Sequence, residues 1–549
     1  MKTTQSLFSD SQLPRWFWLC FVVGLMWLVA LLGRGALPYL VILPAGPYPV
    51  PDVEWTTLWQ RLRVLLPDDV MITLRAAEIL AETGIPSLNR HQLSQPATSL
   101  LYPYFLALFA GGSKALMPLA ALMTGLMSMA CVAWMICRVQ ANRWRWILLT
   151  VLFLNASTVQ YLYSGWEHLP QAAVLVVFLC LHRRFITTGS VSWGIASGLA
   201  VALAIGLRAD SVLLLLPFAF LTPAGRTRLA AWPMFTAGLA AGAFLVLLQW
   251  ESFGWLAPTT ARLKAGGGYD VWVSLKFLLT SLATGSALLV CGLICMLLWW
   301  QRKGVSPSGR AVMFSLLIFI PYGVYVADVF PAARMFIPAM CMGLYALATE
   351  VGAFAALNDR RVRLVSSLVV GLCVMVTGAQ DLIKSRLEDP QTRNWHPMVE
   401  HLMMARTIEQ RLNPDNDVVG LFWLGAASYE LSAYEVNDFL GKGDEVIART
   451  PRKWGMPGHN KWDIRTSIEM HRPSLVIARA DIHHKPRKLR LAAVQKRANW
   501  AFWDDFYETP AVQNGYVYCQ PPWAKEFGLV VRRDKVALFS DICPNPEVP

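Results

Sequence analysis

The sequence predicts a multi-pass α-helical membrane protein with about eleven transmembrane helices and a C-terminal α/β domain. Hydrophobic residues make up 55% of the 549 residues and charged residues only 15%, whereas soluble chains carry roughly 25% charged residues. The apolar residues lie in long uncharged runs, which excludes a disordered chain. Beyond residue 384 the chain becomes more polar, and the runs Val418–Phe422, Leu475–Ala478 and Gly528–Arg532 predict strands between helices.

The apolar runs set the number of spans, because a helix needs about 20 apolar residues to cross a bilayer. The first run predicts a signal anchor, since no small-residue cleavage site follows it, and 210–222 is short and pairs with the run before it. Ser99–Ala110 is too short and contains Pro103, so we expect a helix on the membrane surface. The predicted spans are 15–33, 115–137, 146–163, 169–186, 190–206, 210–222, 230–250, 275–300, 311–326, 335–357 and 364–382.

Basic residues set the orientation, because Lys and Arg favour cytoplasmic loops. A cytoplasmic N-terminus leaves only four cations in the short outer loops, namely Arg208, Arg262, Lys264 and Arg334. The predicted transmembrane domain is then 1–383, with a long first loop (34–114) outside, and the predicted extracytoplasmic domain is 384–549. The net charge of +13 does not indicate nucleic-acid binding, because much of it lies beside the spans.

The cysteines give one candidate disulfide. Eight of the ten lie in apolar runs, where a buried thiol behaves as a small hydrophobic group. Cys519 and Cys543 lie in the C-terminal domain, where they form either a disulfide or two unpaired thiols. No Cys and His spacing indicates a metal. An acid pair is nevertheless able to hold a divalent cation, so the metal requirement stays open.

Asp68 and Asp69 begin a predicted helix over 69–83 in the first loop. One interpretation is that they favour the helix N-terminus electrostatically. The other is chemical: a carboxylate at the membrane boundary loses hydration and can act as a base for a hydroxyl group. The neighbouring acid would then bind an acceptor hydroxyl, a cap or a metal.

Four further polar groups interrupt the apolar sequence on the predicted outer side. Glu167 follows Trp166, which suits either a membrane anchor or a sugar site. Charges so close to the spans are expensive, and they are usually paired or functional. Arg208 and Asp210 form either an internal ion pair or part of a site. The other two groups are Arg262 with Lys264, and Asp328 with Arg334.

Acids and cations on one membrane face are typical of group transfer from a membrane-held phosphate donor to a hydroxyl group. Negative charge develops on the leaving phosphate, and cations stabilise it. The acceptor hydroxyl needs a carboxylate base, and the lipid tail needs a groove between helices. No nucleotide-phosphate loop, nucleophile elbow or zinc motif competes with this interpretation.

Six short segments in order resemble integral-membrane glycosyltransferases of the GT-C class, nearest the bacterial family that adds terminal β-arabinofuranose in mycobacterial cell walls. The resemblance covers about residues 15–480. The segments are Asp68-Asp69 with Ile72, Arg75, Asn89 and Thr98-Ser99; Ser164-Gly165-Trp166-Glu167; Arg208-Ala209-Asp210; Phe253-Gly254 with Pro258-Thr259-Thr260 and Lys264; Asp328 with Arg334, Phe336 and Pro338; and Pro457-Gly458-His459-Asn460-Lys461-Trp462-Asp463.

The resemblance implies a polyprenyl-phosphate sugar donor, such as an arabinofuranose carrier, in a bacterial inner membrane. It implies a glycan, glycolipid or glycoprotein acceptor. The acceptor, the sugar and the stereochemistry stay open. The implied catalytic residue is Asp68, as base or hydroxyl partner, with Asp69 in support. The implied donor-phosphate residues are Arg208, Lys264 and Arg334, and the implied substrate-binding residues are Arg75, Glu167, Asp210, Asp328 and His459, the last being equally well a structural loop histidine.

Two other functions compete with the enzyme. A transporter or flippase of lipid-linked sugars would need polar residues in both leaflets and a midplane site. A non-catalytic glycan-binding membrane protein would not need an acid pair together with cations in the short loops. Transfer from a polyprenyl-phosphate donor is therefore the leading hypothesis.

Overall fold

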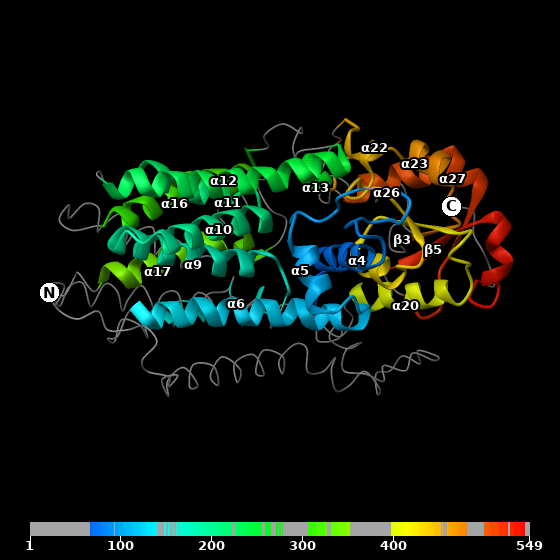
Figure 1. Cartoon of the computed structure of the whole chain (residues 1–549). Helices are drawn as coiled ribbons and strands as arrows, with labels where there is room; N and C mark the ends of the chain where they lie inside the picture. Colours follow the sequence, from blue (N-terminus) through cyan, green and yellow to red (C-terminus); the bar gives the residue numbers. More distant parts are fainter. Residues whose placement is uncertain are drawn as a thin grey trace, which may run out of the picture.

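The structure, a computed structural model, contains a helical bundle at one end and a five-stranded sheet at the other (Figure 1). Helices of the first loop lie between the two (Figure 1). The residues that the structure describes are 66–92, 94–139, 148–149, 152–153, 158, 161–162, 164–221, 226–254, 258–264, 271–272, 274–275, 277, 306–326, 331–351, 397–451, 453, 458–479, 499–524 and 527–543.

The central apolar runs form helices that lie side by side (Figure 1). The described bundle helices are α6 (Met117–Val139), α9 (His168–Thr188), α10 (Val191–Leu207), α11 (Ser211–Phe220), α12 (Arg226–Phe253), α16 (Pro307–Val326) and α17 (Ile337–Val351). α9 packs against α6, α10 and α17, while α10 also packs against α12, and α11 packs against α16. These contacts bury the inward-facing apolar side chains and leave others, such as Leu199 and Phe244, on the outside of the bundle.

Three of the described helices are long and apolar enough to cross a membrane: Lys114–Val139, His168–Thr188 and Pro307–Val326. Shorter apolar helical stretches are Val191–Leu207, Ser211–Phe220 and, within α12, Phe235–Glu251. The predicted spans 15–33 and 364–382, and most of 146–163 and 275–300, lie outside the described residues. The number of eleven spans therefore stays a prediction.

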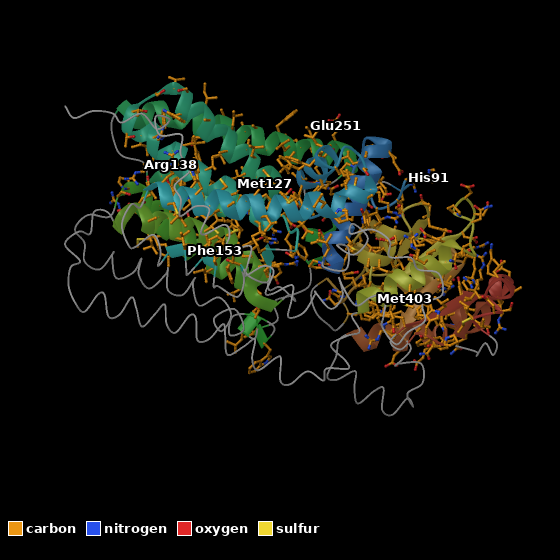
Figure 2. The ribbon with its side chains drawn as sticks, turned by 90° about the horizontal axis from the view of Figure 1, so that it is seen from below. His91, Met127, Arg138, Phe153, Glu251 and Met403 are labelled. Atoms are coloured by element: carbon orange, nitrogen blue, oxygen red, sulfur yellow. A yellow bond between two sulfur atoms is a disulfide. The ribbon has the colours of Figure 1, made fainter. Side chains whose placement is uncertain are left out.

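Contacts at the helix ends show which end of the bundle lies near the C-terminal region. Lys114, at the start of α6, donates to the carbonyl of Glu430 in the C-terminal region at 3.0 Å. Arg138 lies at the other end of α6, while His91 and Met403 lie toward the C-terminal end of the molecule (Figure 2). At the end away from the C-terminal region, the start of α16 meets the end of α17, where Ser306 N donates to Glu350 at 3.1 Å.

The first loop contributes α4 (Asp68–Thr83), α5 (Tyr102–Phe109) and the short η2 (Lys114–Leu116). α4 follows Pro67, whose extended backbone suits a helix boundary, and ends at Gly84 in the left-handed region. α5 is a short helix, as predicted for the Pro103 segment. It buries Tyr102 and Leu106 and exposes Leu108 and Phe109.

The C-terminal region is an α/β unit, which confirms the predicted class. Its sheet has the order β2-β1-β3-β5-β4. The first three strands are parallel, namely β1 (Val418–Leu421), β2 (Glu435–Asp438) and β3 (Leu475–Arg479). β4 (Tyr516–Cys519) and β5 (Phe527–Arg532) are antiparallel. The surrounding helices are α20 (Pro397–Glu409), α21 (Gly425–Glu430), α22 (Glu445–Ala448), α23 (Ile464–His471), α26 (Asn499–Glu508), α27 (Pro510–Gly515) and η4 (Arg533–Phe539).

The first loop shares a hydrophobic core with this sheet. Ile72 of α4 and Leu88 belong to the same buried cluster as Leu421 and Val436. The Asn89 amide donates to Val436 O at 2.8 Å and accepts from Val436 N at 2.9 Å. The predicted first loop and C-terminal domain are therefore packed together.

Cys519 and Cys543 form a disulfide, which settles the alternative left open by the sequence. The bond joins the end of β4 to the segment after η4, across a sequence separation of 24 residues. Cys131, Cys137, Cys180 and Cys341 are free thiols in the described bundle.

Candidate functional site

The acid pair at the start of α4 faces the C-terminal region. Asp68 does not cap its own helix. Its carboxylate accepts hydrogen bonds from Gly425 N at 3.1 Å and Ala426 N at 2.8 Å, the first amides of α21. Burial raises the pKa of Asp68, while Lys442 and these two amides oppose that rise.

Close contact at this point requires glycine. A Cβ atom on Gly425 would lie 1.8 Å from the backbone oxygen of Asp68. The α4 N-terminus and the α21 N-terminus therefore meet with no room for a side chain between them.

Asp69 points to two cations from distant parts of the chain. Its Oδ1 lies 2.8 Å from Lys442 Nζ, and its Oδ2 lies 4.0 Å from an Nη atom of Arg334. The Asp69 side chain keeps 24% of its surface exposed, whereas Arg334 keeps 5%. The Asp69 carboxylate is thus partly accessible, whereas its cationic partner Arg334 is buried.

Lys442 is the residue that sequence reasoning missed. It lies in the turn between β2 and α22, and only 7% of it is exposed. The sequence signal was weak: a lysine between two glycines, Gly441 and Gly443. Nothing in that pattern places the lysine beside the first loop.

Arg334 lies in η3 (Pro331–Phe336), just before α17. Its guanidinium lies 3.7 Å from the centre of the buried Trp166 ring, within the range of a cation–π contact. Trp166 and Glu167 precede α9. The segment before α9 therefore connects Arg334 to a second group of charges.

That second group consists of Arg208 with Glu167 and Asp210. Arg208 Nη1 lies 2.8 Å from Glu167 Oε1, and Arg208 Nη2 lies 2.6 Å from Asp210 Oδ2. Gln171 also donates to Asp210, at 3.1 Å. Arg208 and Asp210 thus form the ion pair that was one of the two predictions. Glu167 adds a second carboxylate to this buried cluster.

Arg75 joins the first loop to the C-terminal region. It is fully buried, and its guanidinium donates to the carbonyls of Leu88, Ser428, Leu431 and Tyr434 and to the Asn89 side chain. Five protein acceptors bind the Arg75 guanidinium, so this side chain links the first loop to the C-terminal region. The substrate contact of Arg75 stays a prediction.

The structure locates the remaining predicted residues only in part. Lys264 ends α13 (Thr259–Lys264), which packs against α22, but its side chain lies outside the described residues. Asp328 also lies outside them. His459 is half-buried in the C-terminal region, with its ring 6.1 Å from that of Phe422.

Among the described residues, no group of three or more His, Cys, Asp or Glu side chains is arranged to hold a metal ion. The acid pair has basic and amide partners instead: Lys442 and Arg334 for Asp69, and the α21 amides for Asp68.

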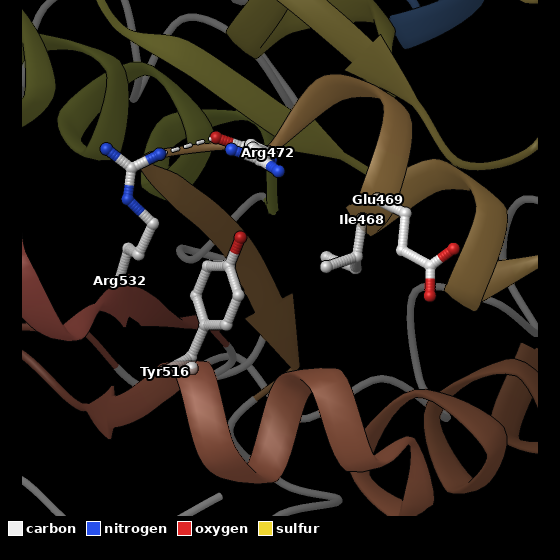
Figure 3. A pocket seen from close by; sticks show the side chains of 6 residues that line it. Ile468, Glu469, Arg472, Tyr516 and Arg532 are labelled. Atoms are coloured by element: carbon white, nitrogen blue, oxygen red, sulfur yellow. Dashed lines mark hydrogen bonds between the residues drawn. The ribbon is translucent and has the colours of Figure 1, made fainter.

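A separate hollow of about 460 Å³ lies at the opposite edge of the sheet, where β4 begins and β5 ends (Figure 3). Arg532 donates to the carbonyl of Arg472 there at 2.7 Å (Figure 3). None of the predicted site residues lines it. The lining residues are Ile468, Glu469, Arg472, Gly515, Tyr516 and Arg532.

The C-terminal region matches one known family model. Residues 388–527 match the family described as "Domain of unknown function (DUF8728)". This segment includes both Gly425 and Lys442. No curated protein matches the chain.

The solved structures that are similar to the chain include two of ArnT from Cupriavidus metallidurans. The structure in the apo state has a TM-score of 0.48 and 12% identity, and the similarity covers 84% of this chain and 93% of that one. The structure bound to undecaprenyl phosphate has the same TM-score and coverage at 11% identity. Similarity at this level carries no argument about chemistry.

Proposed function

We propose that this protein is a membrane glycosyltransferase. It moves a sugar, arabinofuranose by the sequence resemblance, from a polyprenyl-phosphate donor to a hydroxyl group of an envelope glycan, glycolipid or glycoprotein on the outer face. The proposal rests on the partly exposed Asp69 carboxylate, which lies between two cations where apolar helices meet the polar first loop.

Each partner in the reaction needs a different kind of group. An acceptor hydroxyl needs a carboxylate that removes its proton as it attacks the sugar. The leaving phosphate gains negative charge, and a preorganised cation stabilises it. Asp69 and Arg334 supply this pair from positions 265 residues apart in sequence, within 4.0 Å of each other.

Asp69 takes the catalytic role in this proposal, and Asp68 holds the site together. Both oxygens of Asp68 accept backbone N–H groups of α21, so deprotonating a substrate would compete with those bonds. Asp69 has side-chain partners instead of backbone amides, namely Lys442 and Arg334, and 24% of its side chain is exposed.

The cations also divide between two roles. Glu167 and Asp210 already pair with the Arg208 guanidinium, so few of its N–H groups are left for a phosphate. We assign Glu167 and Asp210 to sugar hydroxyls, with Arg208 orienting them. Arg334 is the donor-phosphate residue, and Lys264, Asp328 and His459 keep their proposed roles in phosphate, sugar and acceptor binding.

The test is sugar transfer by the purified full-length protein in lipid nanodiscs. The donors are a synthetic panel of polyprenyl-phosphate sugars that includes arabinofuranose, and the acceptors are envelope glycans, with product measured by mass spectrometry. Asp69→Asn is expected to lower kcat at least about 100-fold, because loss of a general base typically costs that much. Asp415→Asn, at an exposed aspartate of the C-terminal region, is the matched control and should retain activity.

Three results would contradict the proposal. Full activity of Asp69→Asn would remove the base assignment. Movement of the intact donor across a liposome bilayer without transfer would indicate a flippase. Glycan binding without turnover on the whole panel would indicate a non-catalytic binding protein.

A further inference from the structure

The turn between β2 and α22 is held by the residue that precedes it. Asp438, which ends β2, is buried, and its carboxylate accepts hydrogen bonds from Leu440 N at 3.0 Å and Gly443 N at 2.6 Å. One carboxylate thus closes the five-residue turn 439–443, which we call the β2 turn. A fixed turn determines where its side chains point.

The β2 turn also packs directly against the first loop. A Cβ atom on Gly443 would lie 2.3 Å from a side-chain carbon of Leu88. A larger residue at this position would therefore require the Leu88 side chain to move. Lys442 precedes that contact, and its ammonium reaches across to Asp69.

Lys442 is poorly explained as a stabilising ion pair. A buried lysine and carboxylate together contribute little net stability, because removing both charges from water offsets their attraction. An ammonium group has three N–H donors. Within the described part of the chain, Asp69 is the only hydrogen-bond acceptor for Lys442. An anionic ligand beside Asp69 would satisfy the remaining donors.

We propose that Lys442 binds the phosphate of the lipid-linked donor, and that Asp438 is the positioning residue that holds Lys442 in place through the β2 turn. This inference rests on the proposed function and adds a residue from the C-terminal region to the site. The site is then complete only when the C-terminal region is docked on the first loop.

The charged neighbours of this turn keep Lys442 protonated. Burial alone would lower the pKa of Lys442, but Asp69 and Asp68 outweigh burial and raise it. Lys442 therefore carries its charge throughout the physiological pH range.

Asp438 gives the arrangement a pH dependence. Burial raises its pKa to about 6, against the opposing effects of its two amide donors and Lys442, while Asp444 adds to the rise. Asp444 in turn lies 2.9 Å from His471 of α23. As the pH falls through about 6, Asp438 gains a proton and can no longer accept both amide bonds as a carboxylate, so the turn loosens.

Through Asp438, a fall in pH has opposite effects on folding stability and on donor binding. A carboxyl group whose pKa is raised in the folded protein binds its proton more tightly there, so this group costs stability as the pH rises from 3.8 through about 6. Protonation of Asp438 at low pH should therefore weaken donor binding without destabilising the fold. If Asp438 had only a structural role, donor binding and folding stability would not change in opposite directions.

The first test is binding of undecaprenyl phosphate to the full-length protein in nanodiscs at pH 7.5, with undecaprenol as the phosphate-free control. Lys442→Gln should weaken phosphate binding about 10- to 100-fold, as expected when one hydrogen bond to a charged group is lost. Lys442→Arg should restore part of it. Equal affinity of Lys442→Gln and the wild type would overturn the proposal.

The second test separates Asp438 from its neighbours. Donor KM is measured from pH 5 to 8 with a polyprenyl-phosphate sugar, whose phosphodiester does not titrate in this range. The wild type should show KM rising below about pH 6 with kcat less affected, and Asp438→Asn should show a raised KM without that inflection. His471→Gln should keep the inflection. An inflection that survives in Asp438→Asn, or that disappears in His471→Gln, would overturn the positioning role.

The experiments distinguish a failure of the proposed sugar transfer from a failure of the role inferred for Lys442. If Asp69→Asn abolishes transfer but Lys442→Gln leaves both donor KM and phosphate binding unchanged, the enzyme stands and this inference falls. If Lys442→Gln loses phosphate binding while no donor is turned over, the phosphate site stands and the proposed transfer falls.

Discussion

At the residue scale, the acid pair shows how neighbouring identical side chains acquire different roles. Asp68 and Asp69 are adjacent, but a helix turns about 100° per residue, so the two carboxylates point in different directions. Asp68 meets the amides of α21, and Asp69 meets Lys442 and Arg334. The adjacent acids are therefore expected to respond differently to the same substitution.

The Gly425 contact gives a prediction at this scale. Gly425→Ala would place a methyl group 1.8 Å from the Asp68 backbone oxygen, so α4 and α21 must separate. We expect a loss of about 1–3 kcal/mol, typical of overpacking, measured by thermal unfolding in detergent. Gly515→Ala is the matched control, because a Cβ atom there meets nothing within 4 Å. Equal unfolding temperatures for the two variants would contradict this contact.

At the element scale, the first loop folds as part of the C-terminal region. Arg75 fastens α4 to carbonyls on both sides of the interface, and burial lowers its pKa only to about 10, so it stays charged at neutral pH. Ile72 and Leu88 add apolar contacts to the same interface. Cooperative loss of this packing should expose the loop and the sheet together.

Arg75→Leu tests this coupling. Several buried carbonyls would lose their donor, each at a cost of about 1–3 kcal/mol. Hydrogen exchange should then increase in both 66–92 and 425–438. Arg465→Leu, which removes an exposed pair with Glu469, should leave both segments protected. Faster exchange in α4 alone would argue against a shared unit.

The sequence predicts those helices and strands that produce a local pattern of apolar residues. The apolar runs of β1, β3 and β5 predict strands, and the long uncharged runs predict the bundle helices. β2 was missed as a strand because Glu435 and Asp438 interrupt its short apolar pattern, and β4 because it has only four residues. The predicted sidedness placed Asp69 and Arg334 on one face of the membrane, and the structure brings the two side chains within 4.0 Å of each other. Sidedness could not assign Asp68 to a helix 357 residues away, nor select Lys442 from the other C-terminal lysines, because those contacts exist only after docking.

At the scale of the whole molecule, the charged clusters lie where the bundle meets the first loop and the C-terminal region. The contacts of Asp69 with Arg334 and of Lys114 with Glu430 put this junction at one end of the bundle (Figure 1). A donor lipid would approach through the bundle and an acceptor through water. The orientation of that end relative to the membrane is therefore the decisive property of the molecule.

The disulfide tests that orientation. Cys519–Cys543 should form in cells only if the C-terminal region lies in an oxidising compartment. Thiol labelling of unfolded protein, with and without prior reduction, should reveal two additional thiols after reduction. Replacing both cysteines with serine should cost about 2–4 kcal/mol, whereas Cys131→Ser should leave the reduction-dependent labelling unchanged. Two reactive thiols without reduction would place the region in the cytoplasm.

The Asn89 amide has a consequence for assembly. β2 is the outermost strand on its side of the sheet, and such a strand presents unpaired backbone groups to any other extended chain. Asn89 occupies the donor and the acceptor of Val436 as a neighbouring strand would. The Asn89 side chain thus prevents the β2 edge of the sheet from pairing with another molecule. A C-terminal fragment expressed without the first loop would aggregate through this edge.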